Sequence, residues 1–511
     1  MKDERSRKLY DGITNVDDEL VEEAQTAPRR SRTWLKWAAL AACLVIVAVG
    51  AIKLWPPRAP TQQQEPQGTQ QKPGTQQEPG TQEEHEPSPP PDTIEPYEPI
   101  CYQLAGPAYP GVVPYPGENA DSTAYELWEN YIRSLRERPT GYKNGLDGYL
   151  AESTVQFLSG AGTENRVYSP LNVFMALAML AETTGGESRQ QVLDLLGSDS
   201  IDALRDQARA VWNASYRADG IVTTRLANSL WLRDDSAYNQ ACADTLAETY
   251  YASVFRGEMG SDDYNRALRS WLSQQTAGLL DGYIGGVKLS PQTALALAST
   301  IYYKAGWDDE FYEGGTSPDI FHAPGGDVTC DFMHQTREGT VYRGNGFTAV
   351  SKRMRESGWM WLILPDEGTD VDAVLSAGGV MPFLLDGNSR GELGYYTVHL
   401  SLPKFDVSSD VDLADGLRAL GVTDVFDDSR ADFSPLTDAD LVYVDKVEHA
   451  ARVTIDEEGV EAAAYTVIVA PGSAEPGELP EDYYFTLDRP FLFAITGTDG
   501  LPLFVGVVNQ P

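Results

Sequence analysis

The sequence predicts an α+β fold with one large β-sheet for residues 99–511, and two observations support this prediction. Segments early in this region repeat apolar residues every three or four positions, as helices do. Later segments are longer runs rich in β-branched and aromatic residues, separated by turn residues and by further helical stretches. Helices that come first and long strands that come later favour α+β over the regular alternation of an α/β fold.

Three early segments carry the helical pattern, namely 125–139, 148–160 and 170–197. In the third of them Gly185 and Gly186 mark a break, so two helices are expected there. Long strands are expected at 223–233, 293–307, 359–365, 396–405 and 449–459. These strands are the basis for predicting a large sheet.

Before this region, residues 34–55 predict a single transmembrane helix. Residues 37–52 form one apolar run without charge, and Trp34 and Trp55 at the ends bring the span to roughly the 20 residues that a membrane helix needs. Positive charge is concentrated on the N-terminal side. The positive-inside rule therefore places residues 1–33 in the cytoplasm and everything after the span outside.

The alternative to this anchor is a cleaved signal peptide, or lipidation at the cysteine of LAAC, residues 40–43. A polar lead of more than thirty residues is long for a signal peptide. Most of the apolar run also follows the cysteine instead of preceding it. The transmembrane helix is therefore the preferred interpretation.

Residues 56–98 predict a disordered stalk between the anchor and the folded region. They are rich in Pro, Gln and Gly, and a GTQQ(K/E)PGTQ unit recurs imperfectly. Such a composition cannot bury a core and favours an extended, solvated chain. The expected order is a tail, a transmembrane helix, a stalk and a folded domain at 99–511.

Composition and charge argue against several functional classes. The formal net charge is −37, from 39 Lys and Arg against 76 Asp and Glu, which repels nucleic acid and attracts cationic partners. The four cysteines show no CxxC and no regular spacing, so neither a zinc site nor a disulfide framework is expected. No nucleophile elbow, phosphate-binding loop or HExxH motif occurs. We therefore expect no enzyme activity, no metal and no cofactor.

Several segments, taken in order, resemble the serpin family of serine protease inhibitors. FTLDRPFLFAI (485–495), followed by LPLFVGVVNQP, is similar to the family's C-terminal signature, and NRVYSPLNVFMALAML (165–180) is similar to its second helix. LANSLWL, TIYYKAGW, LSLPKF and LRALGVTDVFDDSRADFSPL lie between them in the family's order. The resemblance covers about 141–511 and leaves 99–140 as an N-terminal addition. It implies the serpin fold, with a large central mixed sheet, two further sheets, about eight to nine helices and an exposed reactive-centre loop.

The segment DEEGVEAAAYTVIVAPGSAEPGELPED, residues 456–482, combines helix, strand and loop signals. The resemblance explains the mixture, because the reactive loop of a serpin is exposed at first and becomes a buried strand after a protease cleaves it. Gly459 allows the backbone to bend where the loop leaves its parent strand. The family's hinge maps onto Glu457, Glu458, Gly459, Val460, Glu461, Ala462, Ala463, Ala464, Tyr465 and Thr466.

The hinge residues themselves fit insertion into a sheet. Successive strand side chains point to opposite faces, and every second residue from Val460 to Ile468 is small or apolar. The other face carries Glu461 and Tyr465, and this face suits a more exposed surface. No proline or charge falls in the apolar set before Pro471. Valine at 460, where Thr or Ser is commoner, is a mild departure from the inhibitory pattern.

Two further groups match family positions that control the sheet. The breach, where the loop first enters, maps onto Trp307, Lys404 and Glu457, and the resemblance pairs the carboxylate with the lysine. The shutter, a central polar cluster that holds the sheet closed, maps onto Ser169, Asn172, Ser299 and His449. Asn and Ser are exchanged between positions 172 and 299, which could preserve a hydrogen-bond network.

The resemblance implies a suicide-type inhibitor of extracellular serine proteases, which traps the acyl-enzyme by inserting the loop into the main sheet. It places the reactive bond at Ser473–Ala474, with the bonds on either side as alternatives because the loop is lengthened. No Lys or Arg occurs between Arg452 and Arg489, so trypsin-like targets are disfavoured. Small residues around the bond suit elastase-like or subtilisin-like proteases with a small primary pocket.

The expected partners are serine proteases of cationic character, held covalently by a monomeric inhibitor. No basic patch indicates a heparin-type cofactor. One other function stays open, a non-inhibitory serpin that acts as a surface binding or structural protein. A third, an enzyme or membrane-bound sensor whose activity lies in residues 1–33, meets the objection that this tail is too short for a catalytic core, which leaves it at most a docking role. An N-terminal anchor with a Gln/Pro-rich stalk is more typical of bacteria than of animals. We therefore expect a single-pass protein of a bacterial cell membrane with the serpin domain outside.

Overall fold

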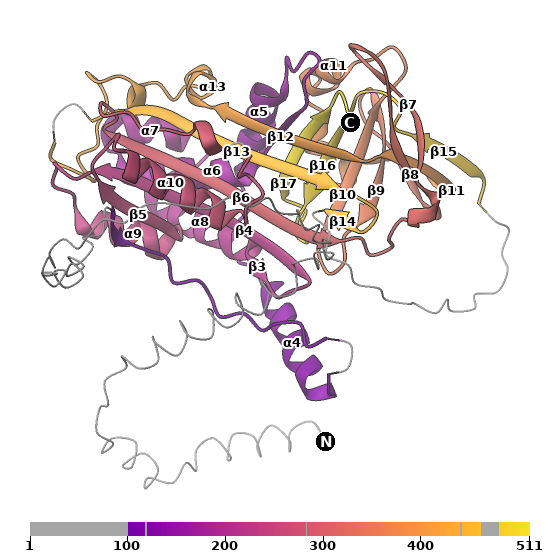
Figure 1. The fold of residues 1–511 in the computed structure, drawn as a ribbon, viewed down its shortest axis with the longest axis horizontal. Helices are drawn as coiled ribbons and strands as arrows, with labels where there is room; N and C mark the ends of the chain where they lie inside the picture. The colour runs from indigo at the N-terminus through magenta and orange to yellow at the C-terminus, as the bar shows by residue number, and fades with distance from the viewer. Residues whose placement is uncertain (1–100, 118–119, 283, 440–441, 461–479) are drawn as a thin grey trace, which may run out of the picture. The chain divides into compact units, whose positions relative to one another are not determined.

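The computed structural model describes residues 101–511 apart from 118–119, 283, 440–441 and 461–479 (Figure 1). These residues belong to one unit of the chain, 94–511. The expected tail, membrane span and stalk lie outside the described residues, and so do most of the reactive loop and the Ser473–Ala474 bond. Within the described part, no helix combines the length and the apolar character that a membrane crossing requires.

Ten α-helices lie in the described part of the chain. The expected break falls between Thr183, where α6 ends, and Gly186, where α7 begins with a φ of +50°. One helix, α4 (Ser122–Leu135), belongs to the N-terminal addition. The other nine are α5 (Leu146–Leu158), α6 (Pro170–Thr183), α7 (Gly186–Leu195), α8 (Ile201–Ser215), α9 (Gln240–Thr249), α10 (Asp262–Gln275), α11 (Val371–Ser376), α12 (Val380–Leu385) and α13 (Ala414–Ala419).

An eight-stranded sheet has the order β1-β5-β4-β6-β14-β13-β12, with β3 paired on β4. The β4–β5 and β6–β13 pairs are parallel and the other pairs are antiparallel, so the sheet is mixed, as expected. Its strands are β1 (Cys101–Ala105), β3 (Arg217–Ala218), β4 (Val222–Arg233), β5 (Ala252–Gly257), β6 (Leu295–Gly306), β12 (Phe405–Asp412), β13 (Val444–Ile455) and β14 (Gly459–Val460).

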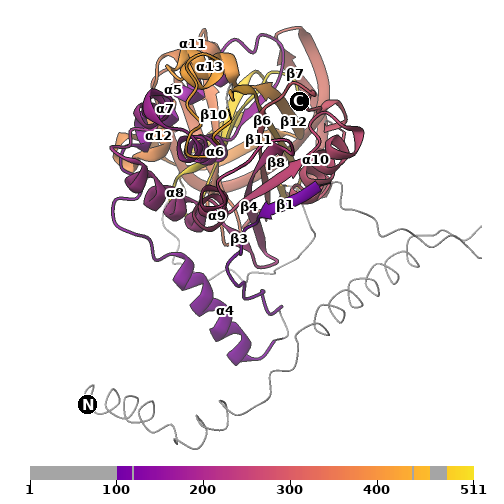
Figure 2. The ribbon, with the colours of Figure 1, turned by 90° about the vertical axis from the view of Figure 1, so that its left-hand side faces the viewer.

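Helices cover both faces of this sheet, and Figure 2 shows α6 and α10 on opposite sides of β6. Alternation along β6 puts Leu295 and Leu297 into the core cluster that contains α6, and Ala296 and Ala298 into a second cluster with α10. A strand that is buried on both faces has no polar side. This explains why β6 appears in the sequence as a nearly continuous apolar run.

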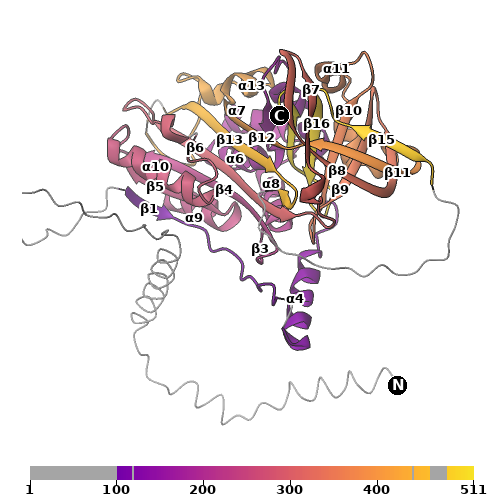
Figure 3. The same cartoon turned by 45° about the vertical axis from the view of Figure 1, so that its right-hand side comes forward.

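A second sheet of nine strands has the order β15-β11-β8-β9-β10-β16-β17-β2, with β7 paired on β8. Two separate further sheets were expected, but here they are continuous because β8 has 18 residues and pairs with β7, β11 and β9 in turn. Figure 3 shows β15 beside β11 at one edge of this sheet. The strands are β2 (Arg166–Tyr168), β7 (Ser317–Ala323), β8 (Gly326–Arg343), β9 (Phe347–Arg353), β10 (Trp359–Pro365), β11 (Gly391–Pro403), β15 (Asp482–Thr486), β16 (Phe491–Thr496) and β17 (Pro502–Val508).

The N-terminal addition supplies an edge strand and a helix. The sequence predicts no role for 99–140; in the structure β1 pairs antiparallel with β5 and covers its edge. Tyr109, which follows β1, stacks on Trp212 and Tyr216 with ring centroids 5.6 Å apart in both pairs. Further along, Asp121 caps α4 by accepting the N–H of Ala124 at 2.8 Å.

Candidate functional site

The start of the loop already contributes a short strand to the eight-stranded sheet. In β14, Val460 pairs with Ala305 of β6 on one side and with Ile455 of β13 on the other. The turn before β14 forms around Asp456, whose carboxylate accepts two backbone N–H groups at 2.9 and 3.1 Å. Val460 is 2 % exposed. The apolar face of the hinge therefore begins inside the sheet.

Gly459 is required by close packing. A Cβ at this position would lie 2.4 Å from the carbonyl oxygen of Ala305 and 2.7 Å from Cα of Gly306. The sequence predicts this glycine for its freedom to bend. The structure adds a second reason, because β14 approaches β6 too closely for any side chain at 459.

The breach residues lie together around the carboxylate of Glu457. Its Oε2 accepts a hydrogen bond from Nζ of Lys404 at 2.7 Å, and its Oε1 accepts one from the hydroxyl of Thr316 at 2.7 Å. Burial alone would raise the pKa of Glu457, but these two hydrogen bonds, a backbone hydrogen bond and the charge of Lys404 together lower the pKa. The same contact raises the pKa of Lys404. Thr316 is a member of the site that sequence reasoning did not identify.

Trp307, the third breach residue, binds the main chain of the hinge. Its backbone N–H donates to the carbonyl of Glu458 at 2.8 Å, and its indole N–H donates to the carbonyl of Asp456 at 2.9 Å. The side chain is fully buried. A fully buried indole with its N–H satisfied is a rigid support. Trp307 therefore holds the main chain at Asp456 and Glu458, just before the point where the loop leaves the sheet.

The four shutter positions lie together where the N-terminal end of α6, with Ser169 and Asn172, packs against β6 and β13. Ser299 of β6 pairs in register with His449 of β13. His449 Nε2 accepts the backbone N–H of Ser169 at 3.2 Å, and the Ser299 hydroxyl donates to the main-chain carbonyl of Asn172 at 3.4 Å. Burial lowers the pKa of His449 to about 4, so the imidazole is neutral at pH 7.

The exchange of Asn and Ser does not recreate a direct side-chain bond. Both amide atoms of Asn172 are buried and make no hydrogen bond to the described protein atoms, because Ser299 uses the Asn172 main chain instead. Asn228 of β4 pairs in register with Ser299 and is buried with its amide equally unpaired. Sequence reasoning missed Asn228. The motif LANSLWL shows two polar residues, Asn228 and Ser229, among apolar ones, and only the register with β6 places Asn228 beside Ser299.

Comparison with known proteins decides the family. Residues 151–511 match the family model described as Serpin (serine protease inhibitor). The chain belongs to the serpin family. An uncharacterized serpin-like protein from Thermococcus kodakarensis is 29% identical over 362 residues, which are 69% of this chain and 82% of that protein. Plasminogen activator inhibitor 1 from Bos taurus is 26% identical over 378 residues, covering 70% of this chain and 89% of that protein.

Solved structures agree on the fold of this serpin. The crystal structure of the thermophilic serpin tengpin in the native state matches with a TM-score of 0.65 at 24% identity, covering 74% of this chain and 96% of tengpin. Thyroxine-binding globulin in complex with thyroxine matches with a TM-score of 0.61 at 21% identity, covering 71% and 99%. The serpin family is one of inhibitors, so the expectation that the chain is not an enzyme is confirmed by its family.

In this serpin the seam that an inserted strand would open is closed below β14. There β6 and β13 pair directly, with Leu297 opposite Val447 and Thr300 opposite Ala450. Ahead of this point β14 already separates the two strands at Ala305 and Ile455. At the breach, β6 and β13 are therefore separated by β14, whereas at the shutter they are hydrogen-bonded to each other.

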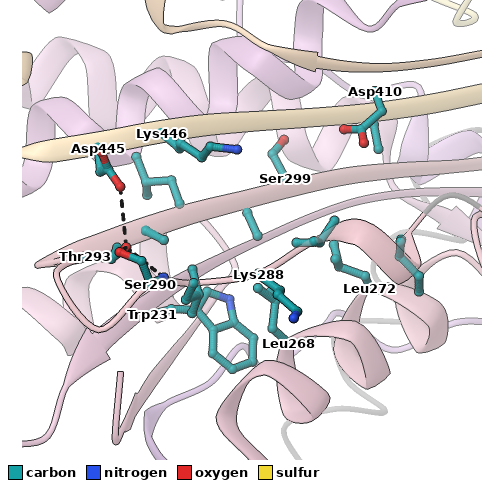
Figure 4. Close-up of a pocket in the computed structure, with 17 residues that line it drawn as sticks. Trp231, Leu268, Leu272, Lys288, Ser290, Thr293, Ser299, Asp410, Asp445 and Lys446 are labelled. Atoms are coloured by element: carbon teal, nitrogen blue, oxygen red, sulfur yellow. Dashed lines mark hydrogen bonds between the residues drawn. The ribbon is translucent and has the colours of Figure 1, made fainter. Parts of the chain in front are cut away.

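A small cavity of about 120 Å³ lies along the same seam, between β6, β13, α10 and the segment that follows α10 (Figure 4). Its walls are mostly apolar and include Trp231 and Leu268. Near one end, the hydroxyl of Thr293 donates to the carboxylate of Asp445 at 3.5 Å, which links the segment before β6 to β13. An apolar cavity therefore adjoins the lower part of the seam.

Two groups of predicted site residues lie outside the described part of the chain. They are Ser473 and Ala474 of the reactive bond, and the second part of the hinge, Glu461, Ala462, Ala463, Ala464, Tyr465 and Thr466. Their roles stay predictions. What the described residues show is the path on both sides of them, since β14 ends at Val460 and β15 begins at Asp482.

Proposed function

We propose that this serpin is a suicide-type inhibitor that traps extracellular serine proteases by inserting its cleaved loop into the eight-stranded sheet. One observation carries the proposal: β14 already lies between β6 and β13, with Val460 buried, and below it those two strands pair directly with each other. The residues after Val460 alternate between an apolar and a polar face, as a strand in that position needs.

The chemistry is that of an ordinary serine protease until insertion occurs. The protease's serine oxygen bonds to the carbonyl carbon of Ser473, the bond to the nitrogen of Ala474 breaks, and the departing amine takes the proton that the serine loses. Water would normally hydrolyse the resulting ester. In our proposal the freed loop extends β14 before water attacks. The new strand gains backbone hydrogen bonds to β6 and β13, and the protease is displaced with its ester intact.

The sequence of the loop supports a target with a small primary pocket. Val469, Ala470, Gly472, Ser473 and Ala474 surround the proposed bond, and no Lys or Arg lies between 453 and 488. A trypsin-like pocket requires a cation at that position, so elastase-like and subtilisin-like enzymes fit better. The negative charge of the chain, −37 in total, favours targets of cationic character.

We further propose that the domain acts outside the cell, tethered by the apolar span 34–55 and the stalk 56–98. The uncharged apolar run and the cluster of positive charges before it support this placement. A tethered inhibitor facing outward would protect a cell surface from external proteases. The Gln/Pro-rich stalk supports a bacterial cell as the surface in question.

The experiment is to mix the full-length chain with pancreatic elastase, subtilisin or trypsin and to analyse the products by denaturing electrophoresis and intact mass spectrometry. We expect a band at the summed mass that survives denaturation with elastase or subtilisin, and none with trypsin. The mass of the released C-terminal peptide identifies the cleaved bond. Cleavage near Ser473 without a stable complex would instead establish the non-inhibitory alternative, a surface protein whose loop is only a substrate.

A further inference from the structure

A lysine side chain is buried directly beneath the breach. Lys352 lies on β9 and is 2 % exposed, although lysine is almost never fully buried unless it is paired. None of the ion pairs between described residues includes it. Its ammonium donates instead to the main-chain carbonyl of Asp309 and, at 2.6 Å, to the side-chain oxygen of Gln335. Neither acceptor carries a formal charge.

Two aromatic rings enclose the rest of this ammonium. Nζ of Lys352 lies 5.2 Å from the ring centroid of Trp307 and 4.2 Å from that of Phe311. The two rings meet edge to face, with centroids 6.1 Å apart. An ammonium near an aromatic face is attracted by the ring quadrupole, and the attraction grows when water is excluded. Two rings and two neutral oxygens therefore lie directly around the ammonium of Lys352.

Both rings belong to the segment 307–311, which binds the main chain of the hinge. The backbone N–H of Trp307 donates to the carbonyl of Glu458 at 2.8 Å, and that of Phe311 donates to the carbonyl of Glu457 at 3.0 Å. Any movement of the segment would therefore move the origin of the loop.

Gln335 of β8 ties the same segment to the same ammonium. Its amide N–H group donates to the carbonyls of Asp309 and Glu310 at 3.3 and 3.1 Å, while its oxygen accepts from Lys352. The lysine thus contacts the segment directly through two rings and one carbonyl, and indirectly through Gln335. A charged ammonium has three N–H donors for these partners, whereas a neutral amine has two.

The environment brings the charge of Lys352 into the neutral range. Burial lowers the pKa of Lys352 to about 7. The charged groups that face it are Asp308, Asp309 and Glu310 of the segment, which raise the pKa, and Arg337 of β8, which lowers it. Two of these carboxylates are also engaged by arginines, at 3.8 Å for Asp308 with Arg353 and 3.0 Å for Glu310 with Arg355.

We propose that Lys352 is a positioning residue for loop capture, which holds the segment 307–311 against the hinge when its ammonium is charged and loosens that hold when it is neutral. The proposal rests on the proposed inhibitory function and adds a pH dependence to it. Deprotonation removes one donor and the attraction of both rings. The hinge is then held less firmly, and a larger share of cleaved loops is lost to hydrolysis before insertion.

The test compares the number of inhibitor molecules consumed per trapped protease between pH 6 and 9, using full-length chains. Lys352→Met is never charged and Lys352→Arg is always charged. We expect the wild type to match K352R at low pH and to approach K352M at high pH, with an overall change of about threefold. Arg266→Met is the control, because it removes an exposed cation whose ion pair is with Asp263 of the same helix, α10, and it should track the wild type. A wild-type to K352M ratio that does not vary with pH would overturn the proposal.

A second variant keeps the test decisive if K352R fails to fold. Gln335→Glu places a carboxylate against the ammonium, which favours the charged form. The transition should then move to higher pH by about one unit or more. A merely structural role for Lys352 would change the efficiency of trapping but not its midpoint. An unmoved midpoint in Q335E therefore contradicts the proposal.

A fluorescence titration without protease separates this proposal from the inhibitory function. The contribution of Trp307, taken as the difference between the wild type and Trp307→Phe, should change with a midpoint near pH 7 and should not change in K352M. A chain that shows this transition but traps no protease refutes the inhibitory function while the charge-dependent hold stands. A chain that traps protease but shows no transition refutes the role of Lys352.

Discussion

Lys404 and Glu457 join the junction of the two sheets to the origin of the reactive loop, with Nζ and Oε2 2.7 Å apart. Lys404 is the single residue between β11 of the nine-stranded sheet and β12 of the eight-stranded sheet. Glu457 lies in the turn between β13 and β14. The ion pair is partly shielded, with side-chain exposures of 37% for the lysine and 11% for the glutamate. The loop therefore starts from a fixed point.

Removing this ion pair should weaken the native state in a pH-dependent way. Because the folded protein lowers the pKa of Glu457, its contribution is full above the unfolded pKa and is lost as the pH falls through the folded value. We expect Glu457→Gln to reduce the free energy of unfolding by up to about 1 kcal/mol at pH 7, the range for a partly exposed pair. Denaturant unfolding at pH 7 and at pH 3 should show a difference that shrinks at the lower pH.

The neighbouring carboxylate provides the control for this pair. Burial and nearby carboxylates raise the pKa of Glu458. Glu458→Gln should therefore leave stability at pH 7 unchanged or slightly higher. An equal loss in both variants would mean that the Lys404 contact is not what stabilises the turn.

Gly459→Ala should displace β14 from β6. The added Cβ would meet the Ala305 carbonyl at 2.4 Å, and backbone atoms cannot move aside as a flexible side chain can. We expect a loss of about 1–3 kcal/mol in the free energy of unfolding, typical of overpacking, together with poorer trapping of protease. Gly387→Ala is the control, since nothing lies within 4 Å of a Cβ there. Thermal and denaturant unfolding of both variants provide the measurement, and equal free energies of unfolding for the two would contradict the prediction.

Protonation of His449 should destabilise the shutter in mild acid. Its folded pKa of about 4 lies below the usual histidine value of 6.5, so the stability of the neutral form is full above pH 6.5 and is lost as the pH falls toward 4. The loss approaches about 3 kcal/mol at the acid end. Melting temperatures between pH 7.5 and 4.5 should fall less steeply in His449→Gln than in the wild type. Substituting the exposed His322 in the same way should not flatten the profile, because its contact with Asp327 raises its pKa instead of lowering it.

A negative charge introduced on the inward face of the hinge should reduce the trapping of protease more than one introduced on the outward face. Val460 is buried in β14, so in a strand that continued β14 after insertion, alternation would put Ala464 on the same inward face and Ala463 on the other. Ala464→Glu would bury a carboxylate on insertion and should turn the inhibitor into a substrate, with about a tenfold or greater loss of trapped complex. Ala463→Glu should cost much less. Similar losses in both variants, measured on denaturing gels, would argue against insertion in this register.

The net charge of the chain should influence the rate of association with the target protease. With a formal charge of −37, association with a cationic protease should slow as salt rises from about 0.05 to 0.5 M, because exposed charges become screened. Stopped-flow or progress-curve rates provide the measurement, with an acidic protease of similar specificity as the control. An association rate with the cationic enzyme that does not depend on salt concentration would contradict electrostatic steering.

Strong periodic signals made much of the fold predictable. The strand expected at 359–365 is β10 with the same bounds, and the strand expected at 223–233 is β4, which begins one residue earlier and ends at the same residue. Both are buried, and a buried strand shows itself as an apolar run. By contrast, 396–405 was expected as one strand, and the structure divides it between β11 and β12 at Lys404. Local periodicity does not say which sheet a residue joins.

The parts of the site that the sequence could not show depend on contacts between distant segments. Asn228 lies in a strand motif like many others, and only its register with Ser299 places it in the shutter. Lys352 would ordinarily be assigned to the outside of a strand. It is buried because β9 passes beneath Trp307 and Phe311, a relationship that no local pattern contains.

The edge strand β1 also decides where mechanical load reaches the domain. A pull on the chain upstream of residue 101 acts first on the β1–β5 pair, and two strands, β5 and β4, lie between β1 and β6, where the seam begins. Tension would therefore be borne along a rim of the sheet that does not part during insertion. If the domain is tethered, tension on the tether would not pull β6 and β13 apart. The native sheet would then keep its closed form under load, and loop insertion after cleavage would not have to overcome that tension.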